Sequence, residues 1–223
     1  MPIENSNIAG KILTFAEKIK MIDFITFCDY TGTFAFAISG IRLASAKQFD
    51  WFGAYVVGVV TAVGGGTIRD ILLNATPFWM VQSSYLIISA LALLFVIIFR
   101  KYVISLNNTF FIFDAIGLGL FGMVGTEKAL AFGFPMWVAI VMGTITGAFG
   151  GMIRDILINE VPLIFRKDIY ALACVLGGFV YYACLRMGLA PSLTQLISAT
   201  SIFVTRILAV KYHISVPVLK GEE

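Results

Sequence analysis

The phrase GGGTIRDILLN at residues 64–74 recurs as GGMIRDILIN at residues 150–159. Each copy lies inside an otherwise apolar segment. Glycine lowers helix stability by about 1 kcal/mol relative to alanine, and arginine and aspartate are costly within a bilayer. Two copies of so unfavourable a phrase indicate a duplicated unit whose role requires these residues.

An offset of 85 residues, with no gap, relates the two copies and much of the chain around them. Shared hydrophobicity would not align Gly, Thr, Arg, Asp, Asn and Pro together. The aligned pairs include Asp29/Asp114, Gly32/Gly117, Thr61/Thr146, Asn74/Asn159, Pro77/Pro162 and Tyr85/Tyr170. The sequence therefore predicts two homologous units, residues 24–99 and 110–186, with one further helix after them.

The composition is that of an integral membrane protein. Hydrophobic residues make up 59% of the 223 residues and charged residues 13%, and the mean hydropathy is +0.93. A membrane helix needs roughly 20 apolar residues. The apolar blocks predict a single all-α transmembrane domain, residues 1–223, with seven helices at 24–41, 51–73, 81–99, 110–127, 135–158, 168–186 and 193–210. Residues 2–20 resemble a polar or interfacial lead-in rather than a cleavable signal peptide.

Three helices per unit place the second unit upside down relative to the first, as in the inverted repeats of many transporters. The loop charges predict the orientation, because cytoplasmic loops are enriched in lysine and arginine. Most of these residues fall on the side opposite the N-terminus: Arg42, Lys47, Arg100, Lys101, Arg166, Lys167, Lys211 and Lys220, with Arg206 near the end of the last helix. We expect a plasma-membrane protein with its N-terminus outside and its C-terminus in the cytoplasm.

Other kinds of function find little support. Cys28, Cys174 and Cys184 show no metal-binding spacing, and the only histidine, His213, falls in the C-terminal tail. We predict no metal site, no cofactor and no enzymatic activity, because no nucleophile and base form a pair. A net charge of +3 gives no reason to expect nucleic acid binding. GGGTIRD also lacks the pattern of a phosphate-binding loop.

The repeated glycines allow two interpretations. Gly64, Gly65 and Gly66, with Gly150 and Gly151, predict a break or kink in the second and fifth helices that exposes backbone polar groups to a pathway. The alternative is close helix packing, since the small residues at 58, 62 and 66, and at 143, 147 and 151, form ladders typical of helix–helix contacts. The attached charges favour the pathway, and both interpretations can hold on different helix faces.

The charges likewise allow alternatives. Neighbouring residues on a helix point about 100° apart, so we expect Arg69 and Asp70, and Arg154 and Asp155, to reach other helices rather than each other. Arg69 could also snorkel to the interface. Asp29 and Asp114 are either helix caps or partners of Arg69 or Arg154 across the interface between the two units. Lys128, whose counterpart is Leu43, is either interfacial or a charge at a pore mouth.

The doubled phrase, GGGTIRD in the second helix and FGGMIRD in the fifth, resembles that of the bacterial and archaeal trimeric intracellular cation channels, the TRIC family. The resemblance covers about residues 24–210. It implies a homotrimer with one pore in each subunit, framed by kinked second and fifth helices and conducting potassium and other monovalent cations such as sodium. Phe149 departs from the pattern in the fifth helix, where the second has a third glycine.

By this resemblance the five glycines form the kinks, and the Arg–Asp pairs form a polar network beside the pore. We expect glycine carbonyls to replace ion hydration, aspartates to favour cations, and Lys128 to act in gating. Membrane lipids surround the trimer. The same family also includes proteins regarded as glycine uptake proteins, so a secondary transporter for a small amino acid is the alternative.

Overall fold

The structure is a computed structural model that describes residues 4–100 and 109–217, with the side chains of residues 24–100 and 110–217. Helices form almost the whole described chain. The first half contains α1 (Glu4–Ala46), α2 (Trp51–Leu72), the short α3 (Phe78–Val81) and α4 (Ser84–Ile98). The second half contains α6 (Thr109–Ala131), α7 (Met136–Leu157), the 3₁₀ turn η1 (Leu163–Phe165), α8 (Ala171–Arg186) and α9 (Pro191–Lys211).

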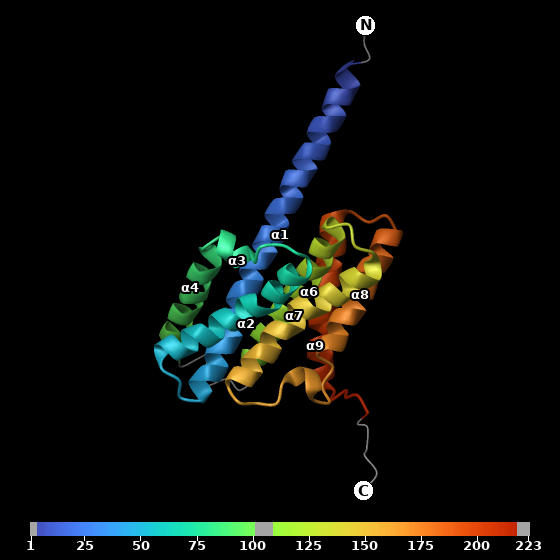
Figure 1. Cartoon of the computed structure of the whole chain (residues 1–223). Coiled ribbons are helices and arrows are strands. Elements are labelled where there is room, and N and C mark those ends of the chain that lie inside the picture. The colour runs from blue at the N-terminus through green and yellow to red at the C-terminus, as the bar shows by residue number, and fades with distance from the viewer. Residues whose placement is uncertain (1–3, 101–108, 218–223) are drawn as a thin grey trace.

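The helices pack into one bundle, and the chain termini leave it at opposite ends (Figure 1). The N-terminal part of α1 projects well beyond the bundle, so residues 4–20 continue the first helix instead of forming a separate lead-in. Within the residues that the structure describes, five spans are long and apolar enough to cross a bilayer, while α4 and α8 are shorter apolar helices of 15 and 16 residues. The predicted all-helical membrane fold is thus confirmed.

Local signals set the helix ends. Asp50 caps α2 by accepting a hydrogen bond from the Gly53 amide at 2.7 Å, as expected for a helix N-terminus. Asn74 and Asn159 follow α2 and α7 with φ values of 54° and 56°, a left-handed conformation that asparagine tolerates better than most residues. The asparagine that ends each copy of the repeated phrase therefore stops its helix and turns the chain.

The contacts between helices follow the offset of 85 residues. A Cβ atom on Gly65 would lie 2.2 Å from the carbonyl oxygen of Thr146, and one on Gly150 would lie 2.2 Å from that of Thr61. Exchanging the two units converts one contact into the other. The crossing of α2 and α7 is therefore built from glycine on one helix and backbone on its partner, in both directions.

Phenylalanines repeat this reciprocity between α1 and α6. Phe36 packs over Gly117 and Phe121 over Gly32, and the two rings meet edge to face with centroids 5.3 Å apart. Such close approach is possible because glycine has no side chain. The four long helices α1, α2, α6 and α7 form the centre of the bundle in this way, and α9 packs outside them against α6 and α8.

The predicted break at the glycines is wrong. Helix α2 runs without interruption through Gly64, Gly65 and Gly66, and α7 does the same through Gly150 and Gly151. The backbone groups there keep their helical hydrogen bonds and are not freed to replace ion hydration. The close packing described above explains the glycines directly, so the packing interpretation holds. A bend of either helix that preserves its hydrogen bonds stays a prediction.

Candidate functional site

Each arginine of the repeated phrase forms an ion pair with the aspartate that follows it. Arg69 Nε donates to Asp70 Oδ1 at 2.8 Å, and Arg154 Nε donates to Asp155 Oδ1 at 2.9 Å. The expectation that these neighbours would not face each other is wrong, because the long arginine side chain folds back over its own helix. Arg69 is only 3% exposed, so it does not snorkel to the interface either.

The second oxygen of each aspartate fixes the chain beyond its helix. Asp70 Oδ2 accepts a hydrogen bond from the Phe78 amide, and Asp155 Oδ2 accepts one from the Leu163 amide, both at 3.0 Å. These amides begin α3 and η1, where N–H groups lack helical partners. The aspartates thus have a structural role that is the same in both units.

Asp29 and Asp114 do not cap helices, because both lie within α1 and α6 rather than at the first turn. Asp114 Oδ1 pairs with Arg154 Nη1 at 2.5 Å, and Ser39 Oγ of α1 accepts a second bond from Nη1 at 2.8 Å. Asp114 therefore pairs with Arg154, but within its own unit, between α6 and α7, and not across the interface of the two units as predicted. Ser39 extends the pair to the other unit.

Asp29, the counterpart of Asp114 in the first unit, has different surroundings. It accepts a hydrogen bond from Tyr85 Oη at 3.4 Å, and its side chain is partly exposed. At this end the other unit supplies a second cation beside Arg69: Lys128 Nζ of α6 lies 2.9 Å from Asp70 Oδ1 of α2. The two ends of the repeat therefore share their arginines and aspartates but differ in how these are paired.

A cavity of about 500 Å³ opens beside Asp29. Its polar lining includes Gln82, Tyr85, Glu127 and Lys128. Deeper in the bundle, Asp29 also borders a narrow pocket that has no room for a water molecule. The lining residues of this constriction are Asp29, Ala62, Gly66, Arg69, Phe78, Phe121 and Thr146. Asp29 and Phe78 line both spaces, and Gly66 and Thr146 place the constriction beside the crossing of α2 and α7.

The structure brings together most of the predicted site residues in two groups. We call the first the outer group, which consists of Asp29, Arg69, Asp70 and Lys128. We call the second the inner group, which consists of Asp114, Arg154 and Asp155. Gly66 borders the constriction, and Gly64, Gly65 and Gly150 lie at the helix crossing. Gly151 lies instead against the Tyr170 hydroxyl group in the inner group.

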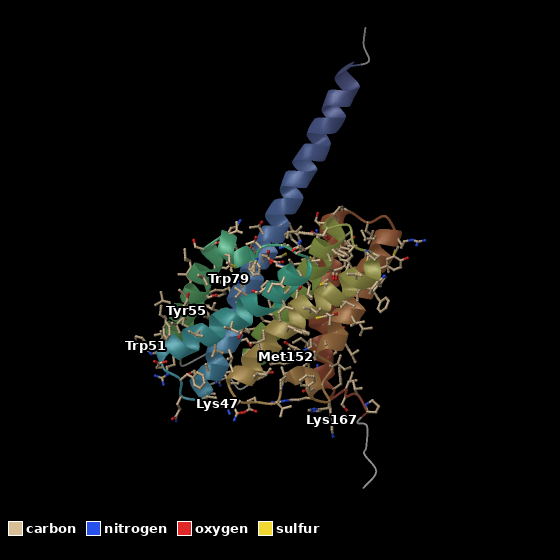
Figure 2. All side chains as sticks on the ribbon, viewed as in Figure 1. Lys47, Trp51, Tyr55, Trp79, Met152 and Lys167 are labelled. Atoms are coloured by element: carbon tan, nitrogen blue, oxygen red, sulfur yellow. The ribbon has the colours of Figure 1, made fainter. Side chains whose placement is uncertain are left out.

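Sequence reasoning missed several residues that contact these groups. Tyr85 and Tyr170 align under the offset, which could have indicated their role. Ser39 and Arg206 gave no such signal, since Arg206 belongs to the helix outside the repeat and entered the sequence argument only as a topology charge. Figure 2 shows Lys47 and Lys167 at the end of the bundle from which the C-terminus leaves, with Trp79 towards the other end.

Comparison with known proteins agrees with this architecture. A family model described as a glycine transporter matches residues 26–101 and 111–186, so both units match it separately. A solved structure described as showing the structural basis for conductance through TRIC cation channels superposes with a TM-score of 0.79. It has 35% sequence identity and covers 89% of this chain and 98% of its own.

This chain is a prokaryotic TRIC family member. The TRIC orthologue from Rhodobacter sphaeroides is also 35% identical, with a TM-score of 0.79 over 85% of this chain and 98% of that one. A UPF0126 membrane protein of Vibrio cholerae is 37% identical over 96% of this chain and 97% of its own length. The inner membrane protein YadS of Escherichia coli K12 is 37% identical over 87% and 96%. This TRIC family member is accordingly a bacterial-type integral membrane protein.

Proposed function

We propose that this protein is a homotrimeric, potassium-permeable cation channel with a separate pore in each subunit, passing beside the crossing of α2 and α7. The observation that supports this most is the cavity over Asp29, which leads to a constriction at the Gly66 face of α2. Asp29 borders both spaces. A partly exposed carboxylate at the narrowing of a pathway attracts cations and repels anions.

In this proposal the structure represents a closed state. The constriction is too narrow for water, and Lys128 places a positive charge beside Asp70 next to it. Opening requires Lys128 to leave Asp70, and a small bend or rotation of α2 against α7 would then widen the space beside Gly66. The arginines act as counter-ions that hold the carboxylates in place. No catalytic step is assigned to any residue, because passive permeation needs none.

The trimer, the surrounding lipid and the membrane orientation belong to the same proposal. We assign α4 and α8 as the remaining two spans, which gives seven. At about 1.5 Å per residue these helices are short for a hydrocarbon core of about 30 Å. In this proposal the N-terminus lies outside the cell, and Lys47 and Lys167 lie at the cytoplasmic end.

A second candidate is a carrier for glycine, favoured by the description of the matching family model. A carrier needs a cation or helix N-terminus free to hold the substrate carboxylate. In this state Arg69 pairs with Asp70, and Arg154 pairs with both Asp114 and Asp155. Neither arginine of the repeated phrase is therefore available to a substrate, which favours the channel.

Proteoliposomes distinguish the two functions. Vesicles containing the purified protein are loaded with potassium chloride, and ion efflux is followed with and without valinomycin and an opposing voltage. The channel predicts voltage-driven potassium flux that external glycine does not alter. Saturable exchange of labelled glycine across the same vesicles, without potassium flux, would establish the carrier instead. Empty vesicles and protein-containing vesicles without a gradient are the controls.

A further inference from the structure

Arg206 of α9 is buried where the inner group of charges meets the last helix. Its side chain is 1% exposed, and Nη1 donates to the carbonyl oxygen of Ile169 at 2.8 Å. The guanidinium lies 4.9 Å from the centre of the Phe111 ring and 4.8 Å from that of Tyr170. Two aromatic faces and one carbonyl thus hold a permanent positive charge inside the bundle.

The repeat shows what this arginine covers. Tyr170 and Asp114 are the counterparts of Tyr85 and Asp29, which border the outer cavity. Tyr85 is 5% exposed and Asp29 is partly exposed, whereas Tyr170 and Asp114 at the inner end are 1% and 0% exposed, so the difference lies mainly in the carboxylate. Arg206 stacks on Tyr170 and so helps to bury the inner group. Arg206 belongs to α9, which lies outside the repeat, so the first unit has no equivalent arginine at the outer end.

Polar atoms in this inner region are left without partners. Asp114 Oδ2, Tyr170 Oη and Arg206 Nε are buried and make no hydrogen bond within the described part of the chain. Unpaired buried polar atoms cost free energy, and native proteins have few of them. A cluster of unpaired polar atoms around a charged side chain is expected where these atoms exchange hydrogen-bond partners, or bind water, in a second state of the protein.

We propose that Arg206 seals the inner end of the permeation pathway and limits the passage of cations there. This inference rests on the proposed channel function. A cation arriving from the outer cavity would meet a fixed positive charge held between two rings in the buried interior of the bundle. The two ends then close differently: Lys128, 28% exposed, pairs with a carboxylate at the outer end, while a stacked, buried arginine closes the inner end.

The first test measures potassium flux in proteoliposomes for Arg206→Gln and for Lys211→Gln. Lys211 ends the same helix but is exposed, so the control removes the same charge outside the pathway. Removing a unit charge from the pathway is expected to raise the flux about fivefold. Lys211→Gln should leave it unchanged. Equal fluxes for Arg206→Gln and the wild type, both above empty vesicles, would overturn the proposal.

Arg206→Gln could fail to fold, so a second variant keeps the charge. Phe111→Leu removes one of the two stacked rings and leaves Arg206 in place, and it is expected to raise the flux by a smaller factor than Arg206→Gln. A folded Phe111→Leu protein with wild-type flux would count against the seal, because the stacking would then have no effect on permeation.

The third test does not depend on ion flux. Cys174 of α8 is 3% exposed and lies, together with Ile202 of α9, against Gly122 of α6, while Cys28 and Cys184 can be replaced by alanine to leave it as the single thiol. A charged methanethiosulfonate reagent should label Cys174 at least fivefold faster after Arg206→Gln than in the parent or after Lys211→Gln. Unchanged labelling would refute the seal. Absence of potassium flux in the parent would refute the channel, and the labelling would still decide the seal.

Discussion

Lys128 of α6 forms an ion pair with Asp70 of α2 at 2.9 Å, and this contact joins the two homologous units at one end only. The offset of 85 residues maps the pair onto Leu43 and Asp155. Leucine cannot form an ion pair, so at the other end Asp155 is bound by Arg154 without a lysine. The Lys128–Asp70 ion pair therefore has no equivalent in the other half of the repeat. It lies beside the cavity that Lys128 helps to line.

Replacing Lys128 by glutamine is expected to raise the potassium flux several-fold. The ion pair at the outer end would be lost and Asp70 would lose one of its two cationic partners, which makes the closed state less stable relative to the open one. Flux assays in proteoliposomes measure this, with Lys128→Arg as the charge-conserving control. A Lys128→Gln protein with the flux and voltage dependence of the wild type would contradict a gating role.

Asp114→Asn should destabilise the protein more than Asp29→Asn. Asp114 is fully buried and pairs with Arg154, and removing one partner of a buried ion pair costs about 3 kcal/mol. Asp29 is partly exposed and has a tyrosine hydroxyl group as its partner, so its loss should cost about 1 kcal/mol. The melting temperatures of the two purified variants in one detergent compare the costs. Equal decreases would show that the two units bind their carboxylates alike.

An alanine at Gly65 or Gly150 should disrupt the crossing of α2 and α7. In each case the added Cβ would lie 2.2 Å from a backbone oxygen of the other helix, so the helices must separate. Overpacking of this kind typically costs about 1–3 kcal/mol. Gly64→Ala is the matched control, since its Cβ would meet the flexible Ile153 side chain at 3.1 Å and the Gly150 Cα at 3.7 Å, which is an ordinary van der Waals distance. Melting temperatures again measure the effect, and a Gly65→Ala protein as stable as Gly64→Ala would contradict the packing account.

A surface ion pair between Lys47 and Glu160 makes the stability of the folded state depend on pH. Lys47 Nζ lies 2.6 Å from Glu160 Oε1 and connects the loop after α1 to the loop after α7. The hydrogen bond and the charge of Lys47 hold the pKa of the Glu160 carboxyl below its ordinary value of 4.5. The folded state therefore gains stability above pH 4.5 and loses it as the pH falls through the lower folded pKa.

The corresponding measurement compares wild type with Glu160→Gln. The wild type should melt slightly higher at pH 7, and the difference should shrink below pH 4.5 and vanish once the pH lies below the lowered folded pKa, where the carboxyl is protonated in both states. The effect is small because both side chains are about two-fifths exposed. A difference of equal size at pH 7 and below the folded pKa would show that Glu160 acts through packing instead of charge.

The sequence was sufficient to predict the membrane helices, because the length of the apolar segments indicates them. It was also sufficient to predict the two homologous units, because the offset of 85 residues relates them. It also predicted Arg154 as a partner of Asp114, although the pair forms within one unit and not between the two. It misjudged the glycines, since a run of glycine predicts a weak helix only when nothing packs against it. Here Thr146 and Thr61 approach Gly65 and Gly150, and tertiary packing keeps the helices intact.

The rest of the site depends on distances that no local pattern reports. Arg69 pairs with its neighbour Asp70 because the side chain is long enough to fold back, which helix geometry alone disfavours. Arg206 was seen as a charge near a helix end. Its burial between Phe111 and Tyr170 depends on how α9 packs against α6 and α8, and only the three-dimensional structure places that helix.

Recording from planar bilayers tests the central claim, that this protein is a cation channel, most directly. Purified protein in a bilayer with a potassium gradient should show unitary current steps that reverse near the potassium equilibrium potential. Lys128→Gln should remain open for a larger fraction of the time. The absence of unitary currents from a folded protein that instead exchanges glycine saturably and stereoselectively against related amino acids would contradict the channel and establish a carrier.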